Sequence, residues 1–311
     1  MTQKKINIPP AVAFILVFAP LFGIMDLQLV GLGFAIQWGV ALCGLNCADM
    51  AEYSDRLLGF ASGYTCNIIA LFFYAIMALV LYSVWYRMAF HKGEKFVNPF
   101  KGLTGRPVLF IAGLIVFTIG AQYLCSYIAE GLGVIFPSWM ARYKDLMEGA
   151  GLSGENLGMV TLIYAVVLGP IVEELSFRGL TYHYARICMP YWAANILQAI
   201  LFGALHGNML QACFAFVLGW LLGYVYEKYN NLLVTMIIHM MYNGFAFLIE
   251  FLAGKLVDID AAADAIEGAN FANPTYAATF AIFFFMSMVM TYLGSQMLTK
   301  ATVKKEVKIS E

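Results

Sequence analysis

The feature that most constrains this chain is a series of apolar runs, each about as long as a membrane-spanning helix. A helix needs about 20 predominantly apolar residues to cross the hydrocarbon core. Hydrophobic residues make up 62% of the chain and charged residues only 12%, more apolar surface than a soluble core of this size could bury. A β-barrel would show short alternating segments instead. We therefore predict an all-α, polytopic membrane protein with about eight transmembrane helices, over Ala11–Leu45, Cys66–Met88, Pro107–Phe136, Leu157–Thr181, Tyr191–Leu205, Leu210–Tyr226, Leu232–Leu252 and Tyr276–Leu298.

Charged residues between these runs predict their orientation. Basic residues are enriched in cytoplasmic loops, and five of them crowd the segment from Arg87 to Arg106. Lys4, Lys5 and the basic C-terminal tail are expected on the same side, whereas the acidic segments 47–64 and 253–275 are expected outside. Ala11–Leu45 is long for one helix and short for two, and one crossing agrees with every loop. We expect a multi-pass protein of a bacterial plasma membrane with both termini cytoplasmic.

The organisation along the chain is expected to have three parts. Residues 1–156 form an N-terminal transmembrane region to which the sequence assigns no role. Residues 157–252 carry the polar motifs, and residues 253–311 contain an external loop, the last span and a basic tail. No small-residue cleavage site follows the first lysines, so we expect this segment to be retained. The six cysteines form no CxxC pair and no disulfide framework.

Two adjacent carboxylates, Glu173 and Glu174, lie inside an apolar run. An ionised side chain in a membrane costs several kcal/mol, roughly 2.5–3.5 on insertion scales, and usually faces a polar cavity. Glu174 and Arg178 are four residues apart and can pair on one helix face. Glu173 is rotated by roughly 100° from its neighbour and is free to act as a base. The alternative is that both carboxylates are held by the arginine only as a helix-packing device, without a catalytic role.

Two histidines occur in the following apolar runs. His206 follows Phe202 by one helical turn and could hold a water, move a proton or bind a metal. His239 and Asn243 are also one turn apart, and two such donors suit a developing oxyanion. Helix–helix hydrogen bonding is the alternative for both motifs. Gly219 and Gly223 form a GxxxG pair, which we interpret as a helix-packing motif.

Glu-Glu-x-x-x-Arg, Phe-x-x-x-His and His-x-x-x-Asn, in this order, resemble the motifs of the CAAX protease and bacteriocin-processing (CPBP) superfamily. That superfamily includes type II CAAX prenyl endopeptidases and Abi-like intramembrane glutamate proteases, and the run Glu-Glu-Leu-Ser-Phe-Arg-Gly resembles its bacterial branch. The resemblance covers about a third of the chain.

The resemblance implies an intramembrane endopeptidase of the glutamate type. Glu173 is expected to activate the attacking water, and His206 to hold that water or shuttle its proton. His239 and Asn243 match the oxyanion-stabilising pair, with Glu174 and Arg178 as the supporting pair. No cofactor is expected. The expected partners are a membrane-embedded or membrane-associated peptide or protein substrate and the lipid bilayer, with no nucleic acid. Cleavage of a prenylated substrate is not implied.

Three alternatives remain. A zinc-dependent protease would use Glu173, His206 and His239 as ligands, because glutamate and histidine are zinc donors, but the sequence has no HExxH motif. A proton-coupled transporter would also use intramembrane glutamates and histidines, although such proteins usually show repeats with broken helices, which are not evident here. A non-proteolytic immunity or scaffold protein would not need all the motif residues intact.

Overall fold

The computed structural model describes residues 8–44, 47–91, 103–149, 159–256 and 270–301, and these residues form helices without a strand. The predicted tail 302–311, Lys4, Lys5, most of the Arg87–Arg106 loop and most of the external segment 253–275 lie outside the described residues. In chain order the helices are α1 (Pro10–Leu16), α2 (Ala19–Cys43), α3 (Met50–Ala61), α4 (Tyr64–Phe90), α5 (Pro107–Ile135), α6 (Pro137–Gly149), α7 (Met159–Ile163), η1 (Tyr164–Leu168), α8 (Gly169–Glu174), η2 (Leu175–Thr181), α9 (Tyr182–Cys188), α10 (Tyr191–Leu205), α11 (Met209–Tyr229), α12 (Leu232–Leu256) and α14 (Pro274–Ala301).

Within the described residues, seven helical stretches are long and apolar enough to cross a membrane: Pro10–Cys43, Tyr64–Phe90, Pro107–Ile135, Met159–Cys188, Met209–Tyr229, Leu232–Ile249 and Pro274–Ala301. The prediction of an all-α, polytopic membrane protein is confirmed. The remaining expected span, Tyr191–Leu205, corresponds to α10. It has 15 residues and is therefore only about 22 Å long, whereas the hydrocarbon core is about 30 Å thick. This helix is apolar but shorter than a full crossing.

The ambiguous region 11–45 is one helical stretch with a break between α1 and α2. Pro20 lies at the start of α2, and proline has no N–H with which to continue the ladder. At this break, the Val17 carbonyl accepts a hydrogen bond from Thr181 Oγ1 at 3.2 Å. The region is therefore a single candidate span, Pro10–Cys43, that bends at its first turns.

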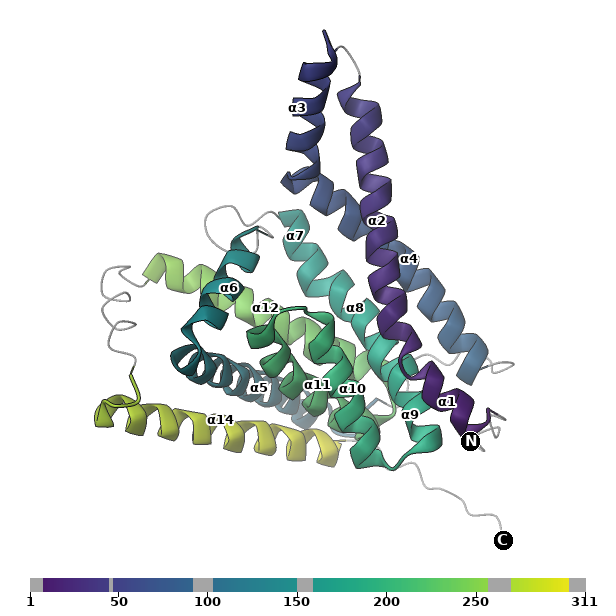
Figure 1. Cartoon of the computed structure of the whole chain (residues 1–311). Coiled ribbons are helices and arrows are strands. Elements are labelled where there is room, and N and C mark those ends of the chain that lie inside the picture. Colours follow the sequence, from purple (N-terminus) through teal and green to yellow (C-terminus); the bar gives the residue numbers. More distant parts are fainter. Residues whose placement is uncertain (1–7, 45–46, 92–102, 150–158, 257–269, 302–311) are drawn as a thin grey trace.

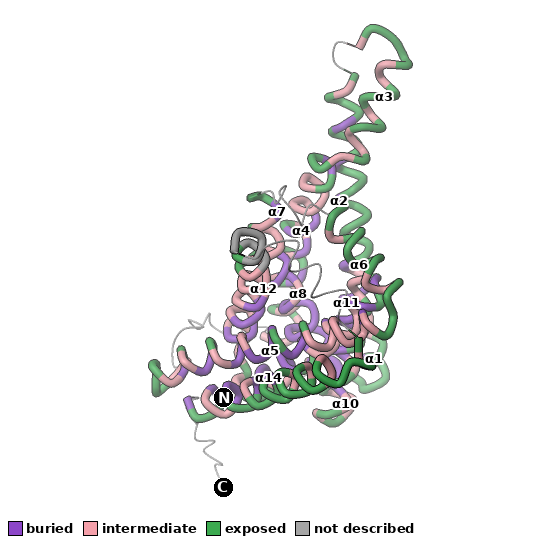
Figure 2. The backbone as a smooth tube through the Cα atoms, turned by 90° about the vertical axis from the view of Figure 1, so that its left-hand side faces the viewer, coloured by how far each residue is buried: buried purple, intermediate pink, exposed green. Residues whose placement is uncertain are grey.

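The helices form an arm and a bundle (Figure 1). Helices α2, α3 and α4 rise as an arm above the rest, and α5 and α14 run side by side along the bottom. Figure 2 shows the same arm from the side, with much of its surface exposed. Close packing of α5 on α14 depends on small residues, since a Cβ on Gly294 would lie 2.4 Å from the backbone nitrogen of Phe117. The continuous stretch Met159–Cys188 packs against α1, α2, α4, α10 and α12, and it carries the glutamates.

Candidate active site

Two π-helical turns, η1 and η2, flank the short α-helix that ends in Glu173 and Glu174. The N–H of Gly169 donates to Tyr164 O and that of Tyr182 to Phe177 O, both five residues back. Pro170 accounts for the first turn, because its missing N–H interrupts the normal ladder. Such π-turns are rare and occur often at functional sites. The sequence predicted a plain α-helix here, so this local widening was missed.

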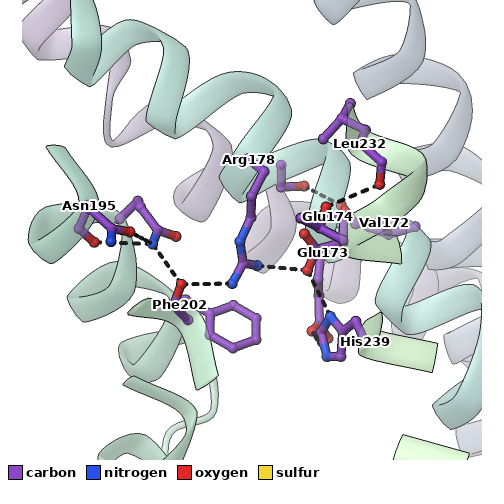
Figure 3. Close-up of polar contacts among 12 residues, drawn as sticks. Val172, Glu173, Glu174, Arg178, Asn195, Phe202, Leu232 and His239 are labelled. Carbon is purple, nitrogen blue, oxygen red and sulfur yellow. Dashed lines mark hydrogen bonds and ion pairs between the residues drawn. The ribbon is translucent and has the colours of Figure 1, made fainter. Parts of the chain in front are cut away.

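The predicted pair between Glu174 and Arg178 forms in the interior of the bundle. Arg178 Nη1 lies 2.9 Å from Glu174 Oε1, and both side chains are fully buried. Arg178 Nη2 donates to the carbonyl of Gly219 at 3.2 Å, and the guanidinium lies 4.7 Å from the centre of the Phe202 ring. Figure 3 shows the guanidinium beside Glu174 and the Phe202 ring. A charge removed from water is tolerated only when it is paired and hydrogen-bonded, and here both conditions hold.

A buried amide pair on α10 supports the arginine from behind. Gln198 Nε2 donates to the same Gly219 carbonyl at 2.8 Å and to Asn195 Oδ1 at 2.8 Å. Asn195 Nδ2 in turn donates to Trp220 O at 3.1 Å. The GxxxG motif makes room for this pair, because a Cβ on Gly223 would lie 1.9 Å from Asn195 Oδ1. The sequence signal was present as two amides in an otherwise apolar helix, but it was not interpreted as part of the site.

His239 connects the two glutamates. Its Nδ1 lies 2.8 Å from Glu174 Oε1 and its Nε2 lies 3.7 Å from Glu173 Oε2. Because Glu174 also faces Arg178, its carboxylate accepts from both partners, which fixes a proton on Nδ1. Glu173 has no arginine partner among the described residues, and 18% of its side chain is exposed, whereas the side chain of Glu174 is fully buried. The two adjacent carboxylates therefore have different surroundings, as their rotation about the helix predicted.

Phe202 and His206 complete this side of the site. The Phe202 ring is edge-on to both histidine rings, 5.2 Å from His206 and 5.7 Å from His239 between ring centres. His206 Nδ1 lies 3.0 Å from the carbonyl of Phe202. A carbonyl only accepts, so Nδ1 carries a proton and, in the neutral ring, Nε2 has the free lone pair. That nitrogen is suited to accept a hydrogen bond from water.

Asn243 is held against the first π-helical turn. Its Nδ2 donates to the carbonyl of Ala165 at 2.8 Å, which leaves its second N–H and its Oδ1 for other partners. The side chain is half-buried. One of its donors therefore anchors the residue, and the other remains available to a bound molecule.

A cavity of about 1000 Å³ brings the predicted residues together. Glu173, His206, His239 and Asn243 all line it, whereas Glu174 and Arg178 are not part of its wall. Tyr164, from the first π-turn, and several side chains of α6 also line the cavity; neither was anticipated from the sequence. The four residues expected to act on a substrate thus share one space, and the two expected to support them lie behind it.

The described residues contain no cluster of three or more histidine, cysteine, aspartate or glutamate side chains arranged to hold a metal. Of the three ligands considered for zinc, His239 holds its Nδ1 against Glu174 and His206 holds its Nδ1 against the Phe202 carbonyl. Zinc-bound histidines are oriented in the same way, with the other ring nitrogen on the metal. The zinc alternative therefore stays a prediction, and no step is derived through a metal.

The fold and this site define a class: a polytopic helical membrane protein with paired glutamates, two histidines and an asparagine around an internal cavity. Residues 155–245 match the family "Type II CAAX prenyl endopeptidase Rce1-like". The match contains all three motifs, and it confirms the resemblance of these helices to the CPBP superfamily. It covers less than a third of the 311-residue chain.

One curated relative is the protein named "Putative membrane peptidase YdiL" of Bacillus subtilis (strain 168). It is 21% identical over 89 residues, which is 29% of this chain and 36% of that protein. The chain thus aligns with about a third of the length of this relative. No solved structure matches the chain significantly.

Proposed function

We propose that this protein is an intramembrane endopeptidase that hydrolyses a peptide bond in or near the membrane with a glutamate-activated water. The observation that carries the proposal is the difference between the adjacent carboxylates. Glu174 is fully buried and held by Arg178 and His239, whereas Glu173 lines the cavity, lies 3.7 Å from His239 Nε2 and has no arginine ion pair among the described residues. A partly exposed carboxylate beside a cavity is suited to take a proton from water.

In the proposed first step, a water between Glu173 and His206 attacks the carbonyl carbon of the scissile bond. Glu173 takes one proton from this water as the new C–O bond forms. The Nε2 lone pair of His206 accepts the other water hydrogen as a hydrogen bond and orients the nucleophile. Positioning of this kind supplies a substantial part of the rate enhancement, because the reacting atoms are held at contact distance.

The negative charge then moves to the carbonyl oxygen, which becomes an oxyanion. Protonated His239 would donate Nδ1–H to Glu174 and Nε2–H into the cavity, and Asn243 would donate its second N–H. Such fixed donors act strongly where water is excluded. With Glu173, Glu174, Arg178 and His239 all ionised, the four formal charges sum to zero, which limits the cost of placing them together.

The tetrahedral intermediate collapses when the C–N bond breaks. The proton held by Glu173 passes to the leaving amine, and the carboxylate returns to its starting state. Glu174 and Arg178 do not exchange protons in this scheme. They orient His239, in the way that a buried carboxylate orients the imidazole of hydrolytic triads.

A comparison of membrane proteomes tests this proposal. Cells that contain the wild-type protein are compared with cells that contain Glu173→Gln, and with Glu148→Gln as the matched control, because Glu148 is exposed on α6 and outside the cavity wall. We expect uncleaved substrate proteins to accumulate in the membrane, and their fragments to disappear, only in cells that contain Glu173→Gln. Identical fragment profiles in all three strains would favour a non-proteolytic immunity or transport role.

A further inference from the structure

The helices have two distinct ends, and side-chain contacts identify each end. At the first end, the Thr104 hydroxyl donates to Ala301 O at 2.8 Å, which joins the start of α5 to the end of α14. Arg186 Nη2 lies 3.6 Å from Glu227 Oε1, which joins the end of α9 to the end of α11. The end of α4 packs there too, since Phe90 lies 5.0 Å from Tyr184 between ring centres.

At the second end, the opposite termini of the same helices meet. The Tyr276 hydroxyl donates to Glu130 Oε1 at 2.6 Å, which joins the start of α14 to the end of α5. The Thr161 hydroxyl donates to the Tyr64 hydroxyl at 2.8 Å, which joins the starts of α7 and α4. The two ends therefore lie on opposite sides of the bundle.

The cavity belongs to the second end. Beyond the catalytic candidates, its wall comes from the last turns of α5, the first half of α11, the start of α14 and helix α6. Helix α6 contributes residues spaced as one helical face, Pro137, Met140, Tyr143, Lys144 and Met147. Pro137 and Lys144 are exposed, so the cavity reaches the surface beside α6. No residue of the first-end contacts lines it.

The charge distribution distinguishes the two ends. Among the described residues, the helix termini of the first end carry the basic residues Arg87, Arg106, Arg186, Lys228 and Lys300. The sequence that links α4 to α5 and the sequence that follows α14 contain further lysines. At the second end, α3 contains more acidic than basic residues, and α6 contains equal numbers of both. An excess of lysine and arginine marks the cytoplasmic side of a membrane protein.

We infer that the cavity opens on the extracytoplasmic side, beside α6, and that the protein takes its peptide substrates from that side of the membrane. The substrate part of this inference rests on the proposed function, whereas the side on which the cavity opens does not. The substrate class is then a peptide segment at the outer surface or in the outer leaflet. Its apolar side chains would meet Met140, Met147 and Phe214 in the cavity wall.

Sidedness is tested by labelling single introduced cysteines in intact spheroplasts with a membrane-impermeant maleimide. The six native cysteines stay in place, and labelling is read by mass spectrometry on the peptide that contains the new cysteine. The variants are Lys144→Cys at the mouth, Arg142→Cys elsewhere on α6, and Lys300→Cys at the basic end, all at exposed positions. We expect labelling of the two α6 variants in intact spheroplasts, and of Lys300→Cys only after permeabilisation. Protection of Lys144→Cys before permeabilisation overturns the inference.

A second readout tests the route of the substrate. A bulky maleimide attached at residue 144 should remove most of the cleavage of the substrates found by proteomics, compared with the same unlabelled variant. The same label at residue 142 should leave cleavage unchanged. If cleavage is blocked equally from both positions, or from neither, entry beside α6 is wrong. Because labelling does not require activity, a failed peptidase proposal and a failed sidedness inference give different results.

Discussion

Replacement of Arg178 by alanine should be among the most damaging changes to this protein. The substitution removes the 2.9 Å ion pair to Glu174, the 3.2 Å hydrogen bond to Gly219 O and the contact with the Phe202 ring. Glu174 would keep its full burial and lose its cation. Breaking a buried pair from one side costs about 3–5 kcal/mol, because the remaining charge is uncompensated.

Thermal unfolding in detergent measures this cost. At roughly 2–4 °C per kcal/mol for a chain of this size class, the apparent melting temperature of Arg178→Ala should fall by roughly 6–20 °C. Arg186→Ala is the matched control, because Arg186 pairs with Glu227 at 3.6 Å with more than a third of its side chain exposed. Pairs of that kind contribute at most about 1 kcal/mol, so this variant should unfold within a few degrees of wild type.

A double variant separates charge from packing. Replacing both members of a buried pair by apolar residues is often neutral, because no unpaired charge remains. Glu174→Leu combined with Arg178→Leu should therefore recover much of the lost melting temperature, while activity stays low because His239 has lost its orienting carboxylate. An Arg178→Ala protein as stable as Arg186→Ala would refute the buried ion pair.

Three further predictions concern the walls of the site. Asn243→Ala should lower turnover by about 10²-fold or more, as deletions of oxyanion donors do, and turnover within twofold of wild type would remove Asn243 from the mechanism. Gly223→Ala should reduce the yield of folded protein, since its Cβ would lie 1.9 Å from Asn195 Oδ1 and 2.6 Å from Gln198 Nε2. The control Gly59→Ala should fold normally, because no atom lies within 4 Å of the added Cβ. Equal yields of the two variants would show that the amide pair can move aside. Extended treatment with a strong chelator should leave peptidase activity unchanged, and activity that disappears with chelation and returns with zinc would replace the glutamate mechanism by the zinc alternative.

The broad architecture could be predicted because membrane crossing is a matter of length and hydropathy. The spans begin and end within a few residues of the predicted ones in most cases, as for Tyr64–Phe90 against Cys66–Met88. The Glu174–Arg178 pair also followed from helical spacing alone. The exception is α10, whose predicted bounds match the observed ones but whose 15 residues are too few for the full crossing expected of it, and which carries two buried amides.

The arrangement of the site could be predicted only in part. Spacing indicated that His239 and Asn243 share a face, but not that His239 would contact both glutamates, because this depends on how α12 packs on α8. The π-turn at Tyr164–Leu168 could have been suspected from Pro170, whereas the turn at Leu175–Thr181 has no proline to signal it. The role of α6 in the cavity wall was missed because it depends on how α6 packs against α5 and α11, which the sequence alone does not indicate.

The central claim is that Glu173 is the base, and purified Glu173→Gln protein in liposomes tests it most directly. Glutamine keeps the shape of the side chain but cannot take a proton from water. Cleavage of a substrate identified by proteomics and the melting temperature are measured together on wild type and variant. We predict that cleavage is abolished while the melting temperature is unchanged, because Glu173 is partly exposed and lies outside the arginine pair. Cleavage at the wild-type rate by a folded Glu173→Gln protein would contradict the glutamate mechanism.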